Sequence, residues 1–174
     1  MGVTITRDGH DWQVDAEQVI DAPLDQVFPF YSDAHNLERI TPDLLRFRVL
    51  TPDPVTMRVG ALIDYRLRVR GFPMRWRTQI LEWDPPHSFV DIQLKGPYEL
   101  WHHTHTFESL GDQTRCVDVV RYRPPGGPLA GLVNRFFVQR DVEAIFHHRM
   151  RVLKEIFALE TETGRSTSPT SSVA

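Results

Sequence analysis

The sequence contains a single cysteine, Cys116, among its 174 residues. No intrachain disulfide and no cysteine-based zinc site can therefore form, which suits a reducing compartment. The sequence also lacks an apolar run of about eighteen residues, the length that a membrane-spanning helix needs. It has no N-terminal basic stretch followed by an apolar run, which is the pattern of a secretory signal. From these absences we expect a cytoplasmic protein.

Motifs of several common catalytic classes are missing as well. No glycine-rich phosphate-binding loop follows a predicted strand, and there is no serine-centred nucleophile elbow or ordered catalytic triad. The formal net charge of -3 provides no global attraction for nucleic acid. The sequence therefore does not support a hydrolase, a nucleotide-binding protein or a nucleic-acid-binding protein.

The composition is that of a folded domain, with 41% hydrophobic and 25% charged residues. A chain of 174 residues is long enough for one domain with its own core. We predict that this domain spans residues 12–160. A flexible N-terminus at 1–11 precedes it, and a disordered tail rich in serine and threonine follows at 161–174.

Alternating hydrophobicity dominates the middle of the chain. Apolar and polar residues alternate from Ile63 to Arg70, which predicts a strand with one buried face. The spacers between such segments are mostly too short for crossover helices, so an antiparallel meander is favoured. We predict seven strands, at 12–21, 45–50, 63–70, 74–83, 88–95, 100–110 and 114–123.

Helical signals flank the predicted sheet. The segment Asp21 to Pro23 favours a helix start, and a second short helix follows Ser32 and ends before Pro42. Residues 129–159 carry apolar side chains at helical spacing, but the apolar stripe changes side, which predicts a kink near 138–141. The predicted fold class is α+β, with a seven-stranded curved antiparallel sheet around a long C-terminal helix and two short helices after the first strand.

This element order resembles the START-like superfamily, also called the SRPBCC or Bet v 1-like helix-grip fold. The resemblance covers roughly residues 12–159 and includes Ile20-Asp21-Ala22-Pro23, Val59-Gly60 and Trp83-Asp84-Pro85-Pro86. The sequence looks most like the bacterial polyketide cyclase/dehydrase and coenzyme Q-binding-like branch. The resemblance implies a pocket for an apolar ligand, but the superfamily includes lipid carriers, hormone receptors and cyclases, so it does not specify a reaction.

The strongest local signal is a strand that places Trp101, His103, His105 and Phe107 on one face. Successive residues on that face lie about 6.5 to 7 Å apart, close enough for two imidazoles to share a ligand, a water or a metal ion. If the aromatic residues point inward, the histidines do so too.

The register of the preceding strand decides what lies opposite these histidines. The sequence leaves two registers open. An odd loop length sets Phe89, Asp91 and Gln93 across from Phe107, His105 and His103, whereas an even length sets Val90, Ile92 and Leu94 opposite the histidines and turns Asp91 to water.

An inward group of Asp91, Gln93, His103 and His105 has three interpretations. It is a structural hydrogen-bonding network, a device that orients a ligand, or an acid-base site in which Asp91 tunes a histidine. A metal site would need Asp91 as its third ligand, without the spacing of a zinc motif, so we predict no metal. No cofactor is predicted either.

Aromatic side chains and one arginine complete the predicted pocket. Arg149 shares a side of the terminal helix with Ile145 and Val152, and either reaches across the pocket mouth toward a carboxylate or phenolate or extends to water. The predicted ligand-binding residues are Tyr65, Trp76, Phe89, Asp91, Gln93, Trp101, His103, His105 and Arg149.

Arginines on the polar sides of three consecutive strands form a basic outer face. This face is either solvated or in peripheral contact with an anionic membrane or an acidic protein. It consists of Arg46, Arg48, Arg66, Arg68, Arg70, Arg75 and Arg77.

The favoured functional prediction is binding or carriage of an apolar small molecule, such as a lipid, an isoprenoid quinone or a polyketide-like compound. The first alternative is a cyclase or dehydratase that uses His103 or His105. The second is a regulatory or interaction domain that uses the basic outer face. Because the favoured function needs only the pocket, enzymatic activity is the less favoured prediction.

Overall fold

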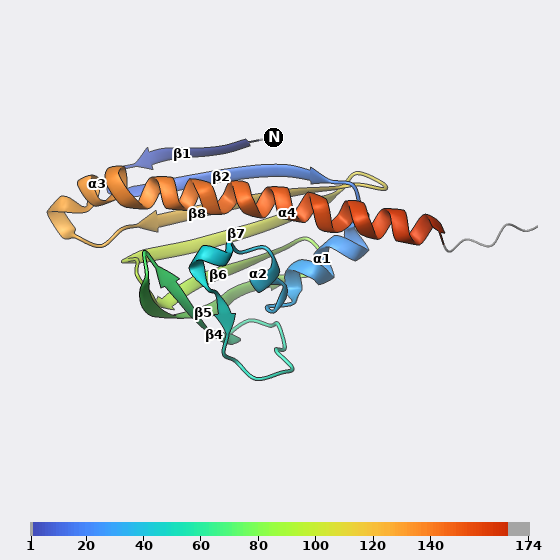
Figure 1. The fold of residues 1–174 in the computed structure, drawn as a ribbon, viewed down its shortest axis with the longest axis horizontal. Coiled ribbons are helices and arrows are strands. Elements are labelled where there is room, and N and C mark those ends of the chain that lie inside the picture. The colour runs from blue at the N-terminus through green and yellow to red at the C-terminus, as the bar shows by residue number, and fades with distance from the viewer. Residues whose placement is uncertain (1, 167–174) are drawn as a thin grey trace, which may run out of the picture.

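The structure is a computed structural model that describes residues 2–166, with side chains described up to residue 159. One eight-stranded antiparallel sheet curves around a long helix, α4 (Gln139–Ser166), which lies along the sheet (Figure 1). The sheet has the strand order β1-β2-β8-β7-β6-β5-β4-β3. Within residues 2–166, no helix combines the length and the apolar composition of a membrane span. This arrangement is the predicted helix-grip fold.

The strands follow one another as a meander, apart from the pairing of β2 with β8. Their bounds are β1 (Gly2–Asp8), β2 (Asp11–Ile20), β3 (Arg48–Val49), β4 (Leu62–Val69), β5 (Phe72–Asp84), β6 (Ser88–Lys95), β7 (Leu100–Ser109) and β8 (Thr114–Arg123).

The helical segments lie in two groups. Between β2 and β3 are α1 (Leu24–Ser32), α2 (Asn36–Arg39) and a 3-10 turn, η1 (Asp43–Leu45). After β8 come η2 (Gly127–Leu129), α3 (Ala130–Val133), one turn of π-helix, η3 (Asn134–Val138), and α4.

The prediction of seven strands is wrong by one, because β1 lies within the N-terminal segment that was predicted to be flexible. It pairs with β2 across its whole length, with Val3 opposite Ala16 and Ile5 opposite Val14. Val3 and Ile5 also pack against the buried cluster that contains Trp12. Only two apolar residues alternate in this segment, which is too weak a signal to distinguish a strand from a polar terminus.

Two predicted elements have different bounds. The strand predicted at 45–50 shrinks to β3, because η1 occupies Asp43–Leu45 and Arg46 has a left-handed φ of 43°. In the terminal helix, the irregular turn η3 ends at Val138, where the predicted kink begins. The helix continues to Ser166, so residues 161–166 are helical rather than part of a disordered tail. The rest of that predicted tail, 167–174, lies outside the described residues.

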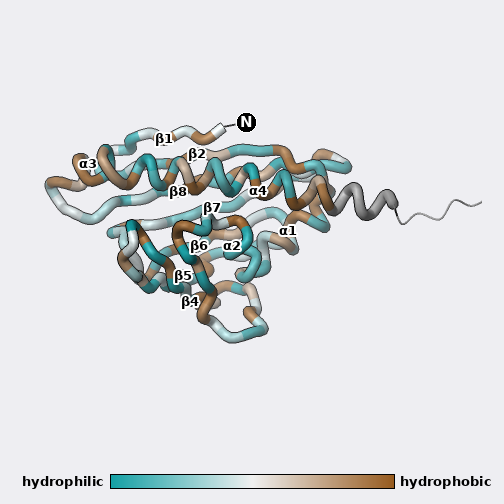
Figure 2. The backbone as a smooth tube through the Cα atoms, viewed as in Figure 1, coloured by the Kyte–Doolittle hydropathy of each residue, from teal (hydrophilic) through white to brown (hydrophobic). Residues whose placement is uncertain are grey.

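The buried apolar side chains form three clusters rather than one continuous core. One joins α1 to the C-terminal half of α4, a second joins β2 and β8 to the start of α4, and a third lies between β4 and β5. Buried and more exposed residues alternate along β2, β4 and β8, and hydrophobic and hydrophilic residues are mixed along the backbone (Figure 2). The space between the clusters is the candidate site.

Candidate functional site

A cavity of about 840 Å³ lies between the sheet, α4 and the segment that contains α1 and α2. Its lining is largely apolar and includes Leu44, Phe72 and Phe137, whose side chains are exposed. These exposed residues mark where the cavity opens. A cavity of this size matches the usual volume of small-molecule sites, which is about 300 to 1,000 Å³.

The predicted aromatic residues Tyr65, Trp76, Phe89 and Trp101 all line this cavity. The rings of Trp76 and Trp101 meet edge to face, with centroids 5.3 Å apart. Trp76 also donates an indole hydrogen bond to Thr78 Oγ1 at 3.0 Å. The aromatic wall is therefore held by contacts between its own members.

The register of β6 against β7 turns Asp91 inward, as the odd loop length predicts. The pairing is shifted by two residues from the predicted one, so that Asp91 lies opposite His103 and Phe89 lies opposite His105. Gln93 does not line the cavity. Its side-chain amide donates to the Tyr98 carbonyl at 2.7 Å, so it closes the turn between the two strands.

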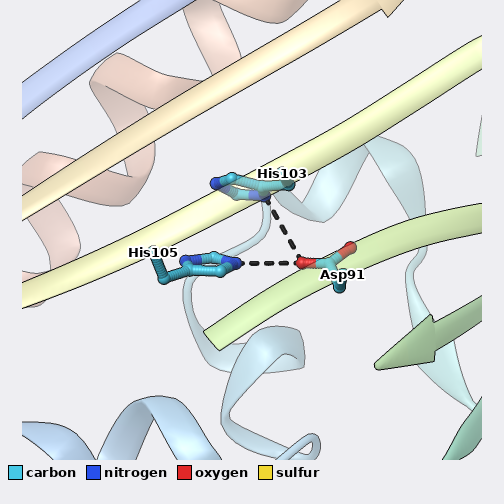
Figure 3. Close-up of side chains that lie close together, drawn as sticks. All are labelled: Asp91, His103 and His105. Atoms are coloured by element: carbon cyan, nitrogen blue, oxygen red, sulfur yellow. Dashed lines mark hydrogen bonds and ion pairs between the residues drawn. The ribbon is translucent and has the colours of Figure 1, made fainter. Parts of the chain in front are cut away.

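The two histidines and Asp91 come together at the sheet side of the cavity (Figure 3). Asp91 Oδ2 lies 2.9 Å from His105 Nε2 and 3.7 Å from His103 Nδ1. The two imidazole rings lie close together, with centroids 3.7 Å apart and planes inclined by 35°. Phe89 stacks on the other side of His105 at a centroid distance of 4.0 Å.

Asp118 on β8 completes the cluster, and the sequence reasoning missed it. One of its oxygens, Oδ1, lies 3.1 Å from His103 Nε2 and 2.7 Å from His105 Nδ1. The signal was present, because Cys116, Asp118, Val120 and Tyr122 alternate with more exposed residues along β8. A buried acid in such a pattern needs a partner, and the inward histidines of β7 are that partner.

The ionisable groups of the cluster differ in the direction in which their pKa values are shifted. Burial opposes charge on His105, but its contacts with Asp118 and Asp91 outweigh burial and raise its pKa. Burial lowers the pKa of His103 to about 4, and the neighbouring His105 adds to that effect. The pKa values of Asp91 and Asp118 are lowered despite burial, by His105 and by Arg149 respectively. His105, between two carboxylates, therefore keeps its proton to higher pH than the neighbouring His103 does.

Asp91, His103 and His105 are also the residues that could hold a metal ion, since their ligand atoms lie within 4.8 Å of one another. The orientations of the rings argue against convergent ligation, because an imidazole lone pair lies in the plane of its ring. Figure 3 shows His105 Nε2 facing Asp91 along its ring plane, whereas Asp91 lies to one side of the His103 ring. The arrangement fits a hydrogen-bonding network better than a metal site.

Arg149 lies inside the structure, not at the mouth or in water. It is only 9% exposed, and its guanidinium lies over the ring of Tyr31 at 5.1 Å. Burial disfavours its charge, but Asp118, Tyr31 and Asp91 together outweigh burial and raise its pKa. Tyr31, on α1, also lines the cavity and was not among the predicted residues.

The basic outer face is partly neutralised by neighbouring acids. Arg48 pairs with Glu38, Arg70 with Asp141, and Arg77 with Asp64. The predicted contact of this face with an anionic membrane or an acidic protein stays a prediction.

Comparison with known proteins relates most of the chain to one family. A profile of the family described as polyketide cyclase/dehydrase and lipid transport matches residues 20–148. A search of curated proteins found no significant match.

Solved structures with the same fold share little sequence identity with the chain. TTHA0849 from Thermus thermophilus is 22% identical with a TM-score of 0.66, over 86% of this chain and 99% of that one. The ZhuI aromatase/cyclase from Streptomyces sp. R1128 is 18% identical with a TM-score of 0.65, over 94% and 100%. Major latex-like protein 151 from Panax ginseng is 17% identical with a TM-score of 0.54, over 80% and 99%. At these identities the likeness establishes the fold alone.

Proposed function

The chain belongs to the polyketide cyclase/dehydrase and lipid transport family, and on that premise we propose that it binds or carries an apolar small molecule in the cavity under α4. One observation carries the proposal. The cavity of about 840 Å³ is walled mainly by aromatic and aliphatic side chains, and its polar lining residues include the cluster of Asp91, His103 and His105. Sites that bind small molecules usually have this form, because apolar walls supply affinity and a few polar groups fix orientation.

The binding energy comes mainly from apolar area removed from water, at about 25 cal/mol per Å². Flat or polyprenyl-like ligands suit the walls, since Trp76 and Trp101 present ring faces and edges at fixed angles. Phe89 and His105 form a stacked pair that extends this surface toward the polar cluster. The guest therefore has its polar end at the cluster and its apolar body against the tryptophans.

The direct test is to identify what the protein retains and what stabilises it. We expect native mass spectrometry of gently purified protein to detect a non-covalent small molecule. We also expect lipids, isoprenoid quinones or aromatic polyketides to raise the melting temperature in a thermal-shift screen, because a ligand that binds only the folded state stabilises it. If no apolar compound is retained and none stabilises the protein, the proposal is wrong.

A second function, acid-base catalysis of a cyclisation or dehydration, is favoured by one observation. His105 lies in the cavity lining with its Nε2 2.9 Å from Asp91 Oδ2, so a proton donor and acceptor face the space where a substrate would lie. We expect a His103→Gln and His105→Gln double variant to lose turnover of a polyketide-like substrate by about 100-fold or more. His102→Gln, on the opposite side of the same strand, is the matched control. Unchanged turnover in the double variant removes this function.

A further inference from the structure

Arg149 has a buried, unsatisfied hydrogen-bond donor in the cavity wall. Its Nε is buried without a hydrogen-bond partner. The two nearby acids are engaged elsewhere, since the closest ion pairs of Asp91 and Asp118 are with His105. Among residues 2–159, no carboxylate lies within ion-pair distance of this guanidinium. A guanidinium carries five N–H donors, and the Nε–H of Arg149 is left for an acceptor that a ligand brings.

The position of Arg149 directs those donors into the cavity. Its guanidinium lies over the Tyr31 ring at 5.1 Å, and the acids Asp118 and Asp91 act on its charge. Arg149 itself belongs to the cavity lining. Because the group is already largely removed from water, a ligand that binds it does not have to displace a full hydration shell.

The charges around Arg149 select the kind of acceptor. Asp91 lines the cavity too, but Asp91 and Asp118 have their shortest contacts with His105, whereas Arg149 keeps a buried Nε without a partner. The other arginine in the lining, Arg70, is bound to Asp141 through two hydrogen bonds of 3.1 Å. A single guanidinium that forms no ion pair within the protein suits a singly charged, planar anion. A carboxylate is such an anion, because its two oxygens accept two parallel N–H hydrogen bonds from the guanidinium.

We propose that Arg149 binds a carboxylate group of the ligand. The natural ligand is then an amphiphilic carboxylic acid, with its carboxylate at α4 and its apolar part against Trp76 and Trp101. This assignment rests on the proposed role of the cavity as a ligand site. The ligand is thereby assigned to the carboxylic acids, and its contact with Arg149 determines its orientation in the cavity.

The experiment compares an acid with its own ester. Dodecanoate and methyl dodecanoate differ in charge and in acceptor strength but have the same chain, and each is tested by displacement of the neutral fluorophore N-phenyl-1-naphthylamine. We expect the wild-type protein to bind dodecanoate about 10- to 100-fold more tightly than the ester, because hydrogen bonds to charged groups are the stronger ones. The comparison needs no mutant, so it does not depend on a variant that folds.

Two variants of the same helix then locate the effect. Arg149→Met is expected to abolish the preference for the acid and to leave the affinity for the ester within about threefold of wild type. Arg149→Lys keeps the positive charge but cannot form two parallel hydrogen bonds, so it is expected to retain part of the preference for the acid. Arg151→Met is the matched control, because Arg151 is exposed and pairs with Glu155 on the same helix. The melting temperature of each variant is measured to confirm that it is folded.

The outcomes separate this inference from the function on which it rests. Fluorophore binding with equal affinity for acid and ester overturns the carboxylate assignment and leaves cavity binding intact. An acid preference that persists in Arg149→Met also overturns it, since another group would then hold the anion. Failure of the fluorophore, the acid and the ester to bind overturns both proposals.

Discussion

At the scale of single residues, the two histidines show how one strand face gives identical side chains different charges. His103 and His105 are both at most 5% exposed, and their rings are in contact. Two imidazolium ions at this separation would repel each other strongly in a medium of low dielectric constant. The proton therefore belongs to the ring that has a short contact with a carboxylate at each end, which is His105.

This division of charge predicts how stability depends on pH. Because the folded-state pKa of His105 is raised, its contribution is fully present below the unfolded value of about 6.5 and is lost as pH rises through the folded pKa. His103, with a pKa of about 4, costs stability as pH falls below about 6.5. We expect the free energy of unfolding, measured by urea denaturation, to be largest near neutral to slightly acidic pH. The groups that face this pair are Asp91 from β6, Asp118 from β8, Arg149 from α4 and Tyr31 from α1.

The variants His105→Gln and His102→Gln test the assignment. Loss of the titrating group in His105→Gln is expected to flatten the alkaline limb of the stability profile above about pH 6.5. His102→Gln, with the same change outside the cluster, is expected to keep it. An alkaline limb that is unchanged in His105→Gln would show that another residue carries the raised pKa.

The sequence predicted part of this site and missed part of it for identifiable reasons. The shared face of Trp101, His103 and His105 on β7 follows from the two-residue period of strands, which is a local property, whereas the sequence left the orientation of Asp91 open between two registers. Asp118 lies on a strand that pairs with β7, and its role depends on the register between them. The depth of Arg149 depends on where α4 lies against the sheet, which one sequence does not determine.

At the scale of elements, one exposed ion pair fastens the β4–β5 hairpin to the start of α4. Arg70, in the hairpin turn with a φ of 51°, donates to both Asp141 oxygens and to the Phe137 carbonyl. Arg70, Phe137 and Asp141 also line the cavity, and Phe137 is one of the residues at its opening. The ion pair therefore joins the two sides of the opening.

Breaking this link is expected to speed ligand exchange without unfolding the protein. The partners are 51% and 44% exposed, so Asp141→Asn should change the free energy of unfolding by no more than about 1 kcal/mol. The rate at which N-phenyl-1-naphthylamine leaves, measured by stopped-flow fluorescence, should rise several-fold as the hairpin and the helix separate more easily. Glu155→Gln, which breaks an exposed pair elsewhere on α4, is the control. Equal rates in the two variants would mean that Arg70 and Asp141 do not limit exchange.

The elements that were predicted well are those with long runs of regularly alternating apolar and polar residues. The bounds of β6 and β8 match the predicted 88–95 and 114–123, because five or more alternating positions determine them. Both β1 and β3 were misjudged, because β1 has only two inward apolar residues and β3 has only two residues. Edge strands depend on pairing with a neighbour, and their own pattern is weak.

At the scale of the whole molecule, the distribution of the core explains why a cavity persists. The three apolar clusters lie at the α1 end of α4, at the β2–β8 side and at the β4–β5 side, and each holds its own part of the sheet in place. The sheet and the helix are thereby fixed around the cavity and do not collapse into it. A domain built in this way gives up some stability of its interior for a binding site, since unfilled apolar volume reduces packing contacts.

Filling the cavity from within should therefore have opposite effects on stability and on binding. Leu67 on β4 is 6% exposed and lines the cavity, whereas Leu62 on the same strand is 46% exposed and points outward. We expect Leu67→Trp to keep or raise the free energy of unfolding, by up to about 2 kcal/mol, because the added ring occupies free volume. The same change should weaken binding of N-phenyl-1-naphthylamine at least tenfold, and Leu62→Trp should leave binding unchanged. In a tightly packed interior the larger side chain would instead cost about 1 to 3 kcal/mol through strain. Destabilisation by Leu67→Trp with undiminished binding would thus contradict the claim that this space between sheet and helix is the ligand site.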